Sequence, residues 1–249
     1  MSNGKSGNGR LAEIGIELMD IVTIRGHTFI ANALDATAVV VDLGAHKGEF
    51  SSEINRRYGC RCHMVEALPA LYVQIEETAS LKKYPFAMAS SDGPLSLFVS
   101  DNPEANSIAQ AAGMQATVPV EGVTLATFMV RAGLDRIDLL KIDIEGAEIG
   151  LLESAGDEVF SAIGQITIEF HDFVPGLVEA AQVEAVTRRL EKLGFSAIKF
   201  SRALNTDVLF VNQRFCHIGP VRRLYYSYII KYLRGIYKVT SRYVPVGGR

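Results

Sequence analysis

The sequence predicts one α/β domain built on a mostly parallel sheet. From about residue 36, apolar strand-like runs alternate with helical stretches, and such alternation requires crossover connections that make neighbouring strands parallel and cover both faces of the sheet. The last two strand-like runs have only a short connection, so we expect that pair to be an antiparallel hairpin. The 249 residues are 48% hydrophobic and 21% charged, which suits one domain with a sizeable core and excludes global disorder.

The elements follow from these patterns. A β-branched run, TAVVVDL, predicts the first strand, and residues 95–123 interrupt the alternation with two further strands around a surface loop at 101–114. The expected strands are 37–43, 61–67, 86–90, 137–142, 165–170, 195–200 and 207–212, and the expected helices are 48–58, 70–81, 145–154 and 177–193.

The two ends of the chain differ from its middle. Residues 1–10 are rich in Gly, Ser and Asn and should be disordered, 11–217 should form the domain with its core at 36–212, and 218–249 form a tail with seven basic residues and no acidic one. We expect no cleaved secretory signal and no membrane span. Three cysteines do not make a disulfide framework, which favours a reducing, cytoplasmic location.

Candidate site residues follow the strands, because ligands of open α/β sheets bind at the carboxyl ends of the strands. In VVVDLGAHKGEF, Asp42 ends the first strand, and Gly44 and Gly48 flank a tight turn. An acid before this turn would repel a pyrophosphate at the helix N-terminus and would suit a ligand carrying an amino group or a sulfonium. An ordinary strand–loop–helix turn is the alternative.

Two further acidic positions support the ligand interpretation. Glu66 ends the second strand, where a carboxylate can accept hydrogen bonds from both hydroxyls of a ribose. In KIDIEGAE, Asp143 and Glu145 follow the fourth strand, although Glu145 and Glu148 also suit a helix N-terminus electrostatically.

These segments, together with VTLATF and ITIEFH, resemble the FkbM-family methyltransferases over residues 36–212. The resemblance implies a seven-stranded, Rossmann-like class I methyltransferase sheet with S-adenosylmethionine as the methyl donor. It also implies O-methylation of a hydroxyl, with sugars, glycans, glycolipids or small natural products as acceptors. A nucleoside-binding protein without catalysis is the alternative, and the absence of G-x-G-x-x-G disfavours a nicotinamide enzyme.

The resemblance also implies individual roles. The family usually has Asn in the glycine turn, where this sequence has His46. Asp42, Gly44, Ala45 and Gly48 would line the methionine part of the cofactor, Glu66 with Ala67 beside it would hold the ribose, Ser90 would lie beside the adenine, and Asp143 would face the methionine amino group or the reaction centre.

Methyl transfer to an alcohol needs a base or a metal that acidifies the hydroxyl. Asp143, Glu145 and His171 are placed to help, with His171 as the expected base; a structural hydrogen bond to a neighbouring acid is the alternative for this histidine. Asp143, Glu145, Glu169 and His171 could also form an oxygen-rich Mg²⁺ site. Cys60, Cys62 and His63 lack the further ligands of a zinc site, and His27 and His217 carry no motif.

The tail contains a basic amphipathic stretch, residues 221–238, rich in tyrosine. Such a helix fits an anionic membrane surface, which would make the protein peripheral at the inner face of the membrane. Packing on the domain, or across the interface of a homo-oligomer, is the alternative. Nucleic acid is not an expected partner, because the rest of the chain is acidic.

Overall fold

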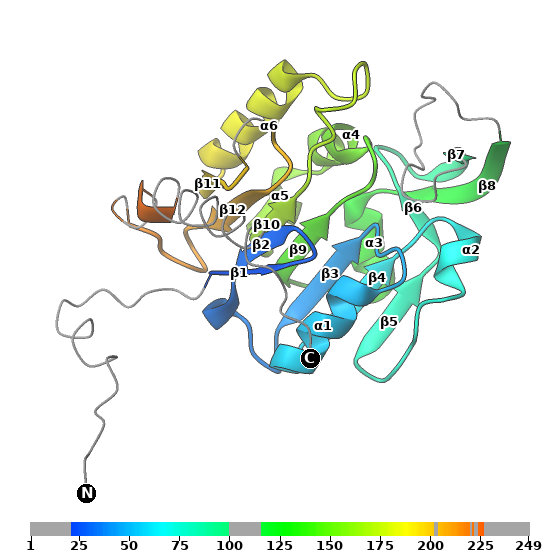
Figure 1. Ribbon diagram of the computed structural model, residues 1–249, viewed down its shortest axis with the longest axis horizontal. Coiled ribbons are helices and arrows are strands. Elements are labelled where there is room, and N and C mark those ends of the chain that lie inside the picture. The colour runs from blue at the N-terminus through cyan, green and yellow to red at the C-terminus, as the bar shows by residue number, and fades with distance from the viewer. Residues whose placement is uncertain (1–20, 100–115, 202–203, 220, 222–223, 227–249) are drawn as a thin grey trace, which may run out of the picture.

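A seven-stranded sheet forms the centre of the protein (Figure 1). The computed structural model describes residues 21–99, 116–201, 204–219, 221 and 224–226. The strand order is β11-β12-β10-β9-β3-β4-β5, and β12 is antiparallel to both of its neighbours while the other pairs are parallel, which confirms the predicted architecture. The strands are β3 (Val39–Leu43), β4 (Arg61–Val65), β5 (Leu81–Tyr84), β9 (Ile137–Ile142), β10 (Ile163–Ile168), β11 (Phe195–Lys199) and β12 (Val208–Asn212).

Both faces of the sheet are covered. Successive side chains of a strand point to opposite sides, and here the side chains on both sides are apolar and buried. Val41 belongs to a core cluster shared with the helices on one face, and Val40 belongs to a second cluster shared with α1 and an N-terminal hairpin on the other. The helices are α1 (Glu49–Tyr58), α2 (Pro69–Tyr72), α3 (Leu125–Ala132), α4 (Glu148–Ser154), α5 (Asp157–Ser161) and α6 (Ala180–Lys192). Of these, α3 and α5 were not expected, and α4 and α6 begin three residues later than predicted.

The predicted helix at 70–81 is wrong beyond Tyr72, and the predicted strand at 86–90 forms as Phe86–Met88 but is not the third strand of the main sheet. The helix ends at Tyr72, and the third strand of the main sheet is Leu81–Tyr84. A turn precedes this strand, in which the Leu81 amide bonds to the Thr78 hydroxyl and the Thr78 amide to the Leu81 carbonyl. Local side-chain bonds of this kind compete with helix formation.

Residues 86–88 instead join a separate three-stranded sheet of order β6-β8-β7. Its strands are β6 (Phe86–Met88), β7 (Gly93–Val99) and β8 (Ala116–Val123), so the two inserted strands are confirmed. The expected loop at 101–114, the expected disorder at 1–10 and most of the tail lie outside the described residues.

A hairpin of β1 (Ile21–Ile24) and β2 (His27–Ile30), followed by the 3-10 turn Ala31–Ala33, was not predicted. Its two-residue turn has positive φ at Arg25 and Gly26, the geometry of a tight hairpin turn. Side chains from the main sheet hold it: Gln165 bonds both backbone groups of Ile30, and Asp207 accepts from the amide and hydroxyl of Thr28. The hairpin thus lies against β10 and β12.

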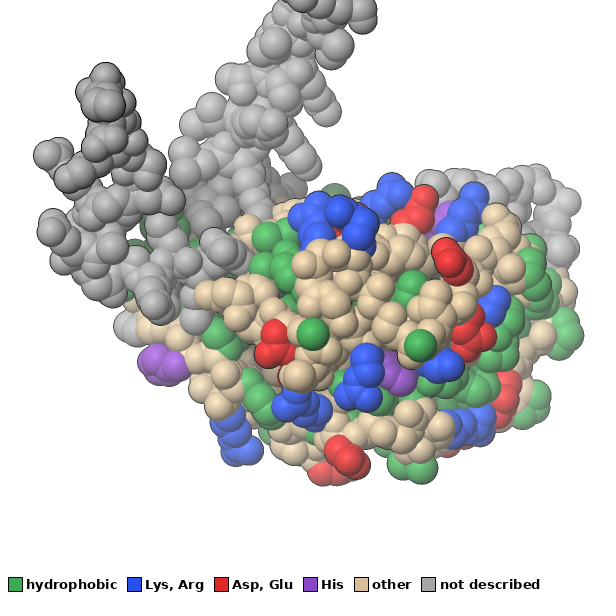
Figure 2. All heavy atoms as spheres, turned by 90° about the horizontal axis from the view of Figure 1, so that it is seen from below, with side chains coloured by type: hydrophobic (Ala, Val, Ile, Leu, Met, Phe, Trp, Pro, Cys, Tyr) green, Lys and Arg blue, Asp and Glu red, His purple; other side chains and the backbone are tan. Residues whose placement is uncertain are grey.

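The surface is mixed. Figure 2 shows acidic and basic side chains of the described residues interspersed among hydrophobic ones on one face. Among the described residues, no helix has the length and apolar character to cross a membrane. The distinctive concentration of ionisable groups lies instead at the strand ends.

The glycine after β3 is required by a close backbone contact. A Cβ at Gly44, where φ is 77°, would lie 1.8 Å from the Asp143 carbonyl oxygen, whereas at Gly59, with φ 72°, the nearest atom is 3.4 Å away. Gly59→Ala should cost about 1–2 kcal/mol for its left-handed backbone. Gly44→Ala should lose at least about 1–3 kcal/mol more from overpacking, measured by denaturant unfolding. Equal losses would show that the loop moves away from Asp143 at little cost.

Candidate functional site

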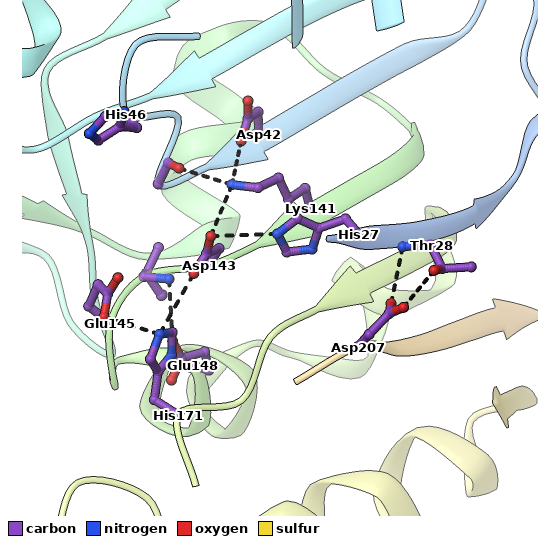
Figure 3. A network of polar contacts seen from close by, with 12 residues as sticks. His27, Thr28, Asp42, His46, Lys141, Asp143, Glu145, Glu148, His171 and Asp207 are labelled. Carbon is purple, nitrogen blue, oxygen red and sulfur yellow. Dashed lines mark hydrogen bonds and ion pairs between the residues drawn. The ribbon is translucent and has the colours of Figure 1, made fainter. Parts of the chain in front are cut away.

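A buried lysine ties together the ends of two central strands (Figure 3). Lys141 is 4% exposed, and its Nζ lies 2.9 Å from Asp42 Oδ1, 2.9 Å from the Gly44 carbonyl oxygen and 3.7 Å from Asp143 Oδ2. The register of β3 and β9 sets Asp42 beside Lys141. Although burial alone would lower it, the pKa of Lys141 lies above its ordinary value because of the two carboxylates. The lysine is therefore charged.

Asp42, predicted to line the methionine part of the cofactor, makes two contacts within the protein. Its side chain is fully buried, one oxygen pairs with Lys141, and the other accepts a hydrogen bond from the Ser51 hydroxyl at 2.8 Å. The carboxylate is therefore engaged inside the protein, and its contact with the cofactor stays a prediction. The sequence could not show this, because the partner lies on a strand far along the chain.

The glycine turn and the end of β4 are joined through Glu66. One Glu66 oxygen accepts from the His46 amide and the other from the Leu68 amide, both at 2.8 Å. Burial raises the pKa of Glu66 while these two bonds oppose the rise. Each oxygen keeps a second lone pair, so the carboxylate can still accept from ribose hydroxyls.

The backbone of the turn explains its residue types. Gly44, His46 and Gly48 all have positive φ, at 77°, 53° and 75°. Asn and His are the side chains that adopt this conformation more readily than most, which accounts for Asn in the resembling family and for His here. His46 reaches Glu66 through its main chain.

The remaining residues assigned to the cofactor lie as follows. Gly48 is the N-cap of α1, Ala45 is buried beneath the turn, and Ala67 is half-buried after Glu66. Ser90 is exposed and lies beside Gly150 of α4, following β6 of the small sheet rather than a strand of the main sheet.

His171 lies between two carboxylates. Its Nδ1 is 2.8 Å from Glu148 Oε1 and its Nε2 is 3.1 Å from Glu145 Oε2, with Asp143 Oδ1 at 3.8 Å. Burial alone would lower the pKa of His171, but the hydrogen bonds to Glu145 and Glu148 raise it to about 10. An imidazolium at neutral pH cannot accept a proton. A charged His171 favours the alternative, a structural hydrogen-bonding role between acids, over the predicted role as the base.

The backbone after β9 is shaped for this arrangement. Glu145 has φ 51°, and Gly146, with φ 97°, has no room for a Cβ beside Leu177. A left-handed non-glycine residue stores strain and is typical of functional sites. This bend delays the start of α4 until Glu148, whose fully buried carboxylate also accepts from the Gly146 amide at 3.0 Å.

His27 is a site residue that sequence reasoning missed. The hairpin places its Nε2 3.5 Å from Asp143 Oδ2, and the ring is 1% exposed. Burial would raise the pKa of Asp143, but Lys141, His27 and His171 hold it well below its ordinary value. The IVTI-RG-HTFI pattern signals a hairpin, but no local signal links it to Asp143.

Two sets of side chains place ligand atoms close enough for a cation: His27, Asp143 and Glu169, and Asp143, Glu145 and His171. Mg²⁺ favours oxygen ligands and retained waters, whereas each set contains a histidine nitrogen. The shared Asp143 already faces the Lys141 ammonium. The residues present therefore do not fit Mg²⁺.

The strand order, with one antiparallel strand beside an edge, is that of the class I methyltransferase fold, and acids lie in β3 and directly after β4 and β9. A family model described as the methyltransferase FkbM domain matches residues 42–197, more than half of the chain. The chain therefore belongs to the FkbM methyltransferase family, which confirms the resemblance seen in the sequence.

Individual relatives are more distant. The AMB antimetabolite synthetase AmbE of Pseudomonas aeruginosa is 40% identical over 63 residues, which are 25% of this chain and 3% of that protein. A solved FkbM methyltransferase from Methylobacillus flagellatus KT is 12% identical with a TM-score of 0.46, over 71% of this chain and 44% of that one. TrmK of M. capricolum, solved with S-adenosyl-homocysteine, is 8% identical with a TM-score of 0.42, over 87% and 86%. The chain thus spans a small part of AmbE and less than half of the solved FkbM protein, and the family assignment does not depend on these matches.

The His171 ion pairs predict a pH-dependent stability. Between its ordinary pKa of 6.5 and about 10, the folded protein retains the proton on His171 and the unfolded chain has lost it. The free energy of unfolding should therefore fall as pH rises through this window, by up to about 1.4 kcal/mol per pH unit. His171→Gln should remove this slope in urea titrations between pH 7.5 and 9.

A second variant tests the cause of the raised pKa. Glu145→Gln removes one of the two carboxylates that bond to the ring, so the fall in stability should still begin near the ordinary pKa of 6.5 but should end at a lower pH than in the wild type. An unchanged slope in His171→Gln would assign the pH dependence to other groups.

Proposed function

We propose that this protein is an S-adenosylmethionine-dependent O-methyltransferase. The observation that carries the proposal is the position of Glu66 and Asp143 on either side of the glycine turn, at the carboxyl ends of β4 and β9, the two strands that flank β3, in a chain of the FkbM family. One nucleoside spans such a pair of strand ends, with its ribose at the first acid and its charged portion towards the second.

The charge of the site suits this donor. The described cluster holds the acids Asp42, Asp143, Glu145, Glu148 and Glu169 against the cations Lys141 and His171. An excess of negative charge favours a ligand with an ammonium and a sulfonium. When bound, the donor would supply an electrophilic methyl group, and the protein would position the acceptor and tune the charges around it.

For the acceptor, we propose a hydroxyl of a sugar, glycan or glycolipid. Phe173 is 42% exposed, and its ring centre lies 5.2 Å from that of His171. An exposed aromatic ring beside the charged cluster can pack against the apolar face of a sugar ring while its hydroxyls meet the polar groups.

A small natural product is the second candidate, because the matched AmbE is named as an antimetabolite synthetase. Methyl transfer to an envelope glycan extract, compared with transfer to small-molecule extracts, distinguishes the two. Binding of the donor without transfer to either would favour a protein that has lost catalysis.

The ribose assignment predicts the effect of one substitution. Glu66→Gln should weaken S-adenosylmethionine binding by about 1–3 kcal/mol, because a charge-assisted pair of hydrogen bonds becomes an amide contact. Calorimetric titration measures the change. The matched control is Glu153→Gln, an exposed position on α4. Unchanged affinity with an intact fold would remove Glu66 from the binding site.

Glu66 also holds two backbone amides, so thermal unfolding of the Glu66→Gln variant should accompany the titration. Weaker binding in a variant that unfolds at the wild-type temperature assigns the loss to the ribose contact. A large fall in unfolding temperature would assign it to the loop.

For the tail, we propose contact with an anionic membrane surface, which would place the protein at the inner face of the membrane. Packing on the domain or in a homo-oligomer is the competing proposal. The described start of the tail packs inward: Tyr226 is 1% exposed and belongs to the core cluster that contains Phe29. Val221 and Leu224 are exposed, but five of the seven basic residues of the tail lie at 227–249, so the proposed contact with anionic lipid depends mainly on that segment.

Deletion of residues 227–249 keeps this buried tyrosine and should leave S-adenosylmethionine binding unchanged while abolishing co-sedimentation with phosphatidylglycerol vesicles. The full chain should bind them at low salt and release them at high salt, because each Lys or Arg near such a surface contributes about 1 kcal/mol that salt screens. Phosphatidylcholine vesicles are the control. Full-length protein that ignores anionic vesicles, or a deletion that unfolds the domain, would favour the packing alternative.

A further inference from the structure

The identity of the base can be argued from the contacts within the site, and this inference rests on the proposed transfer to a hydroxyl. A hydroxyl is a weak nucleophile until a group within hydrogen-bond reach takes its proton. The ionisable side chains that face the site come from every element packed around it: His27 of β2, Asp42 of β3, Lys141 of β9, Asp143, Glu145 and Glu148 after β9, and Glu169 and His171 after β10.

Three of these groups bind one another. His171 uses both ring nitrogens, towards Glu145 and Glu148, and it is held as a cation. Glu148 is fully buried, beyond the reach of an acceptor. Glu145 already accepts a hydrogen bond from the charged His171 ring at 3.1 Å, so its carboxylate is engaged.

A second set is engaged around the lysine. Asp42 is fully buried and paired with Lys141. Asp143 faces Lys141, His27 and His171 at 3.5–3.8 Å, and these groups stabilise its ionised form. His27 is 1% exposed and points its Nε2 at Asp143, so it does not meet an acceptor directly.

Glu169 is different. Its amide donates to the Ile142 carbonyl at 3.1 Å, which continues the pairing of β10 with β9 and holds Glu169 beside Asp143. One of its carboxylate oxygens lies within 4.8 Å of ligand atoms of both Asp143 and His27. In the described part of the chain, no hydrogen bond or ion pair engages this half-buried side chain.

We propose that Glu169 is the general base that takes the proton of the acceptor hydroxyl. Its pKa supports this: burial and the neighbouring carboxylates raise it to about 7, near the pH at which a base can both accept and release a proton.

The step balances. The acceptor oxygen forms the O–CH₃ bond as the S–CH₃ bond of the donor breaks, and the bonding pair stays on sulfur, which becomes a neutral thioether. The hydroxyl proton goes to the Glu169 carboxylate and then to water. His171 and Lys141 keep their protons throughout and hold the surrounding carboxylates in place.

The test compares the full-length wild type with Glu169→Gln, Glu169→Asp and the surface control Glu153→Gln. Methyl-tritiated S-adenosylmethionine and a panel of 4-nitrophenyl glycosides serve as probes. Glu169→Gln should lose about 10²–10⁴-fold in turnover with unchanged donor affinity by calorimetry, and Glu169→Asp should recover part of it. The wild-type rate should rise with pH through about 7, and this limb should vanish in Glu169→Gln.

If no glycoside is methylated, a ¹³C NMR titration of labelled glutamate carboxyls tests whether Glu169 has the pKa of a general base. A carboxyl that titrates near 7 with S-adenosylhomocysteine bound, and is absent from Glu169→Gln, supports the proposal; titration of Glu169 at its ordinary value of 4.5 overturns it.

Two activity results also overturn it: full turnover by Glu169→Gln, or loss of wild-type turnover on chelation with recovery on adding Mg²⁺ or Mn²⁺. If the wild type does not bind S-adenosylmethionine, the proposed function itself has failed, a result separate from the assignment of the base.

Discussion

The buried ammonium of Lys141 is the constraint on which the site depends. A charge at 4% exposure is stable only with partners, and Lys141 has three: Asp42 on the neighbouring strand β3, Asp143 directly after its own strand β9, and the Gly44 carbonyl in the glycine turn. Removing any one would leave buried charge uncompensated. The same contacts bring the glycine turn against β9, which is why Gly44 has no space for a side chain.

Positive and negative groups then alternate outward from the lysine. Asp143 lies between Lys141 and His171, and His171 lies between Glu145 and Glu148. Side chains fixed in this way need little reorganisation when charge moves during a reaction, which is the main electrostatic contribution of enzymes. The left-handed backbone at Glu145 is part of this order, since it turns the chain so that two glutamates reach one imidazole.

Sequence patterns predicted what depends on local periodicity and on topology. Buried β-branched runs located the central strands, and the strand-end rule located Asp143, Glu145 and His171, which the structure brings together. The helix predicted after β4 failed because local turn bonds at Thr78 outweighed helix-compatible composition. The roles of Asp42 and His171, and the presence of His27, depend on strand register and on the packing of a distant hairpin. The residues in these contacts are far apart in the chain, so local sequence patterns could not predict the distances between them.

An excess of negative charge creates a difficulty for methyl transfer, because it stabilises the positively charged donor more than the neutral thioether product, and binding that favours the ground state slows a reaction. Proton uptake by a carboxylate within the same cluster offsets this. As the sulfonium loses its positive charge, Glu169 loses its negative charge, so the total charge of the donor and the surrounding ionisable side chains stays constant. Lys141, Asp143 and His171 then face the same net charge before and after the step. A base located outside the cluster would leave them with one more uncompensated negative charge after transfer. The electrostatics therefore favour a base that belongs to the cluster and is not already paired.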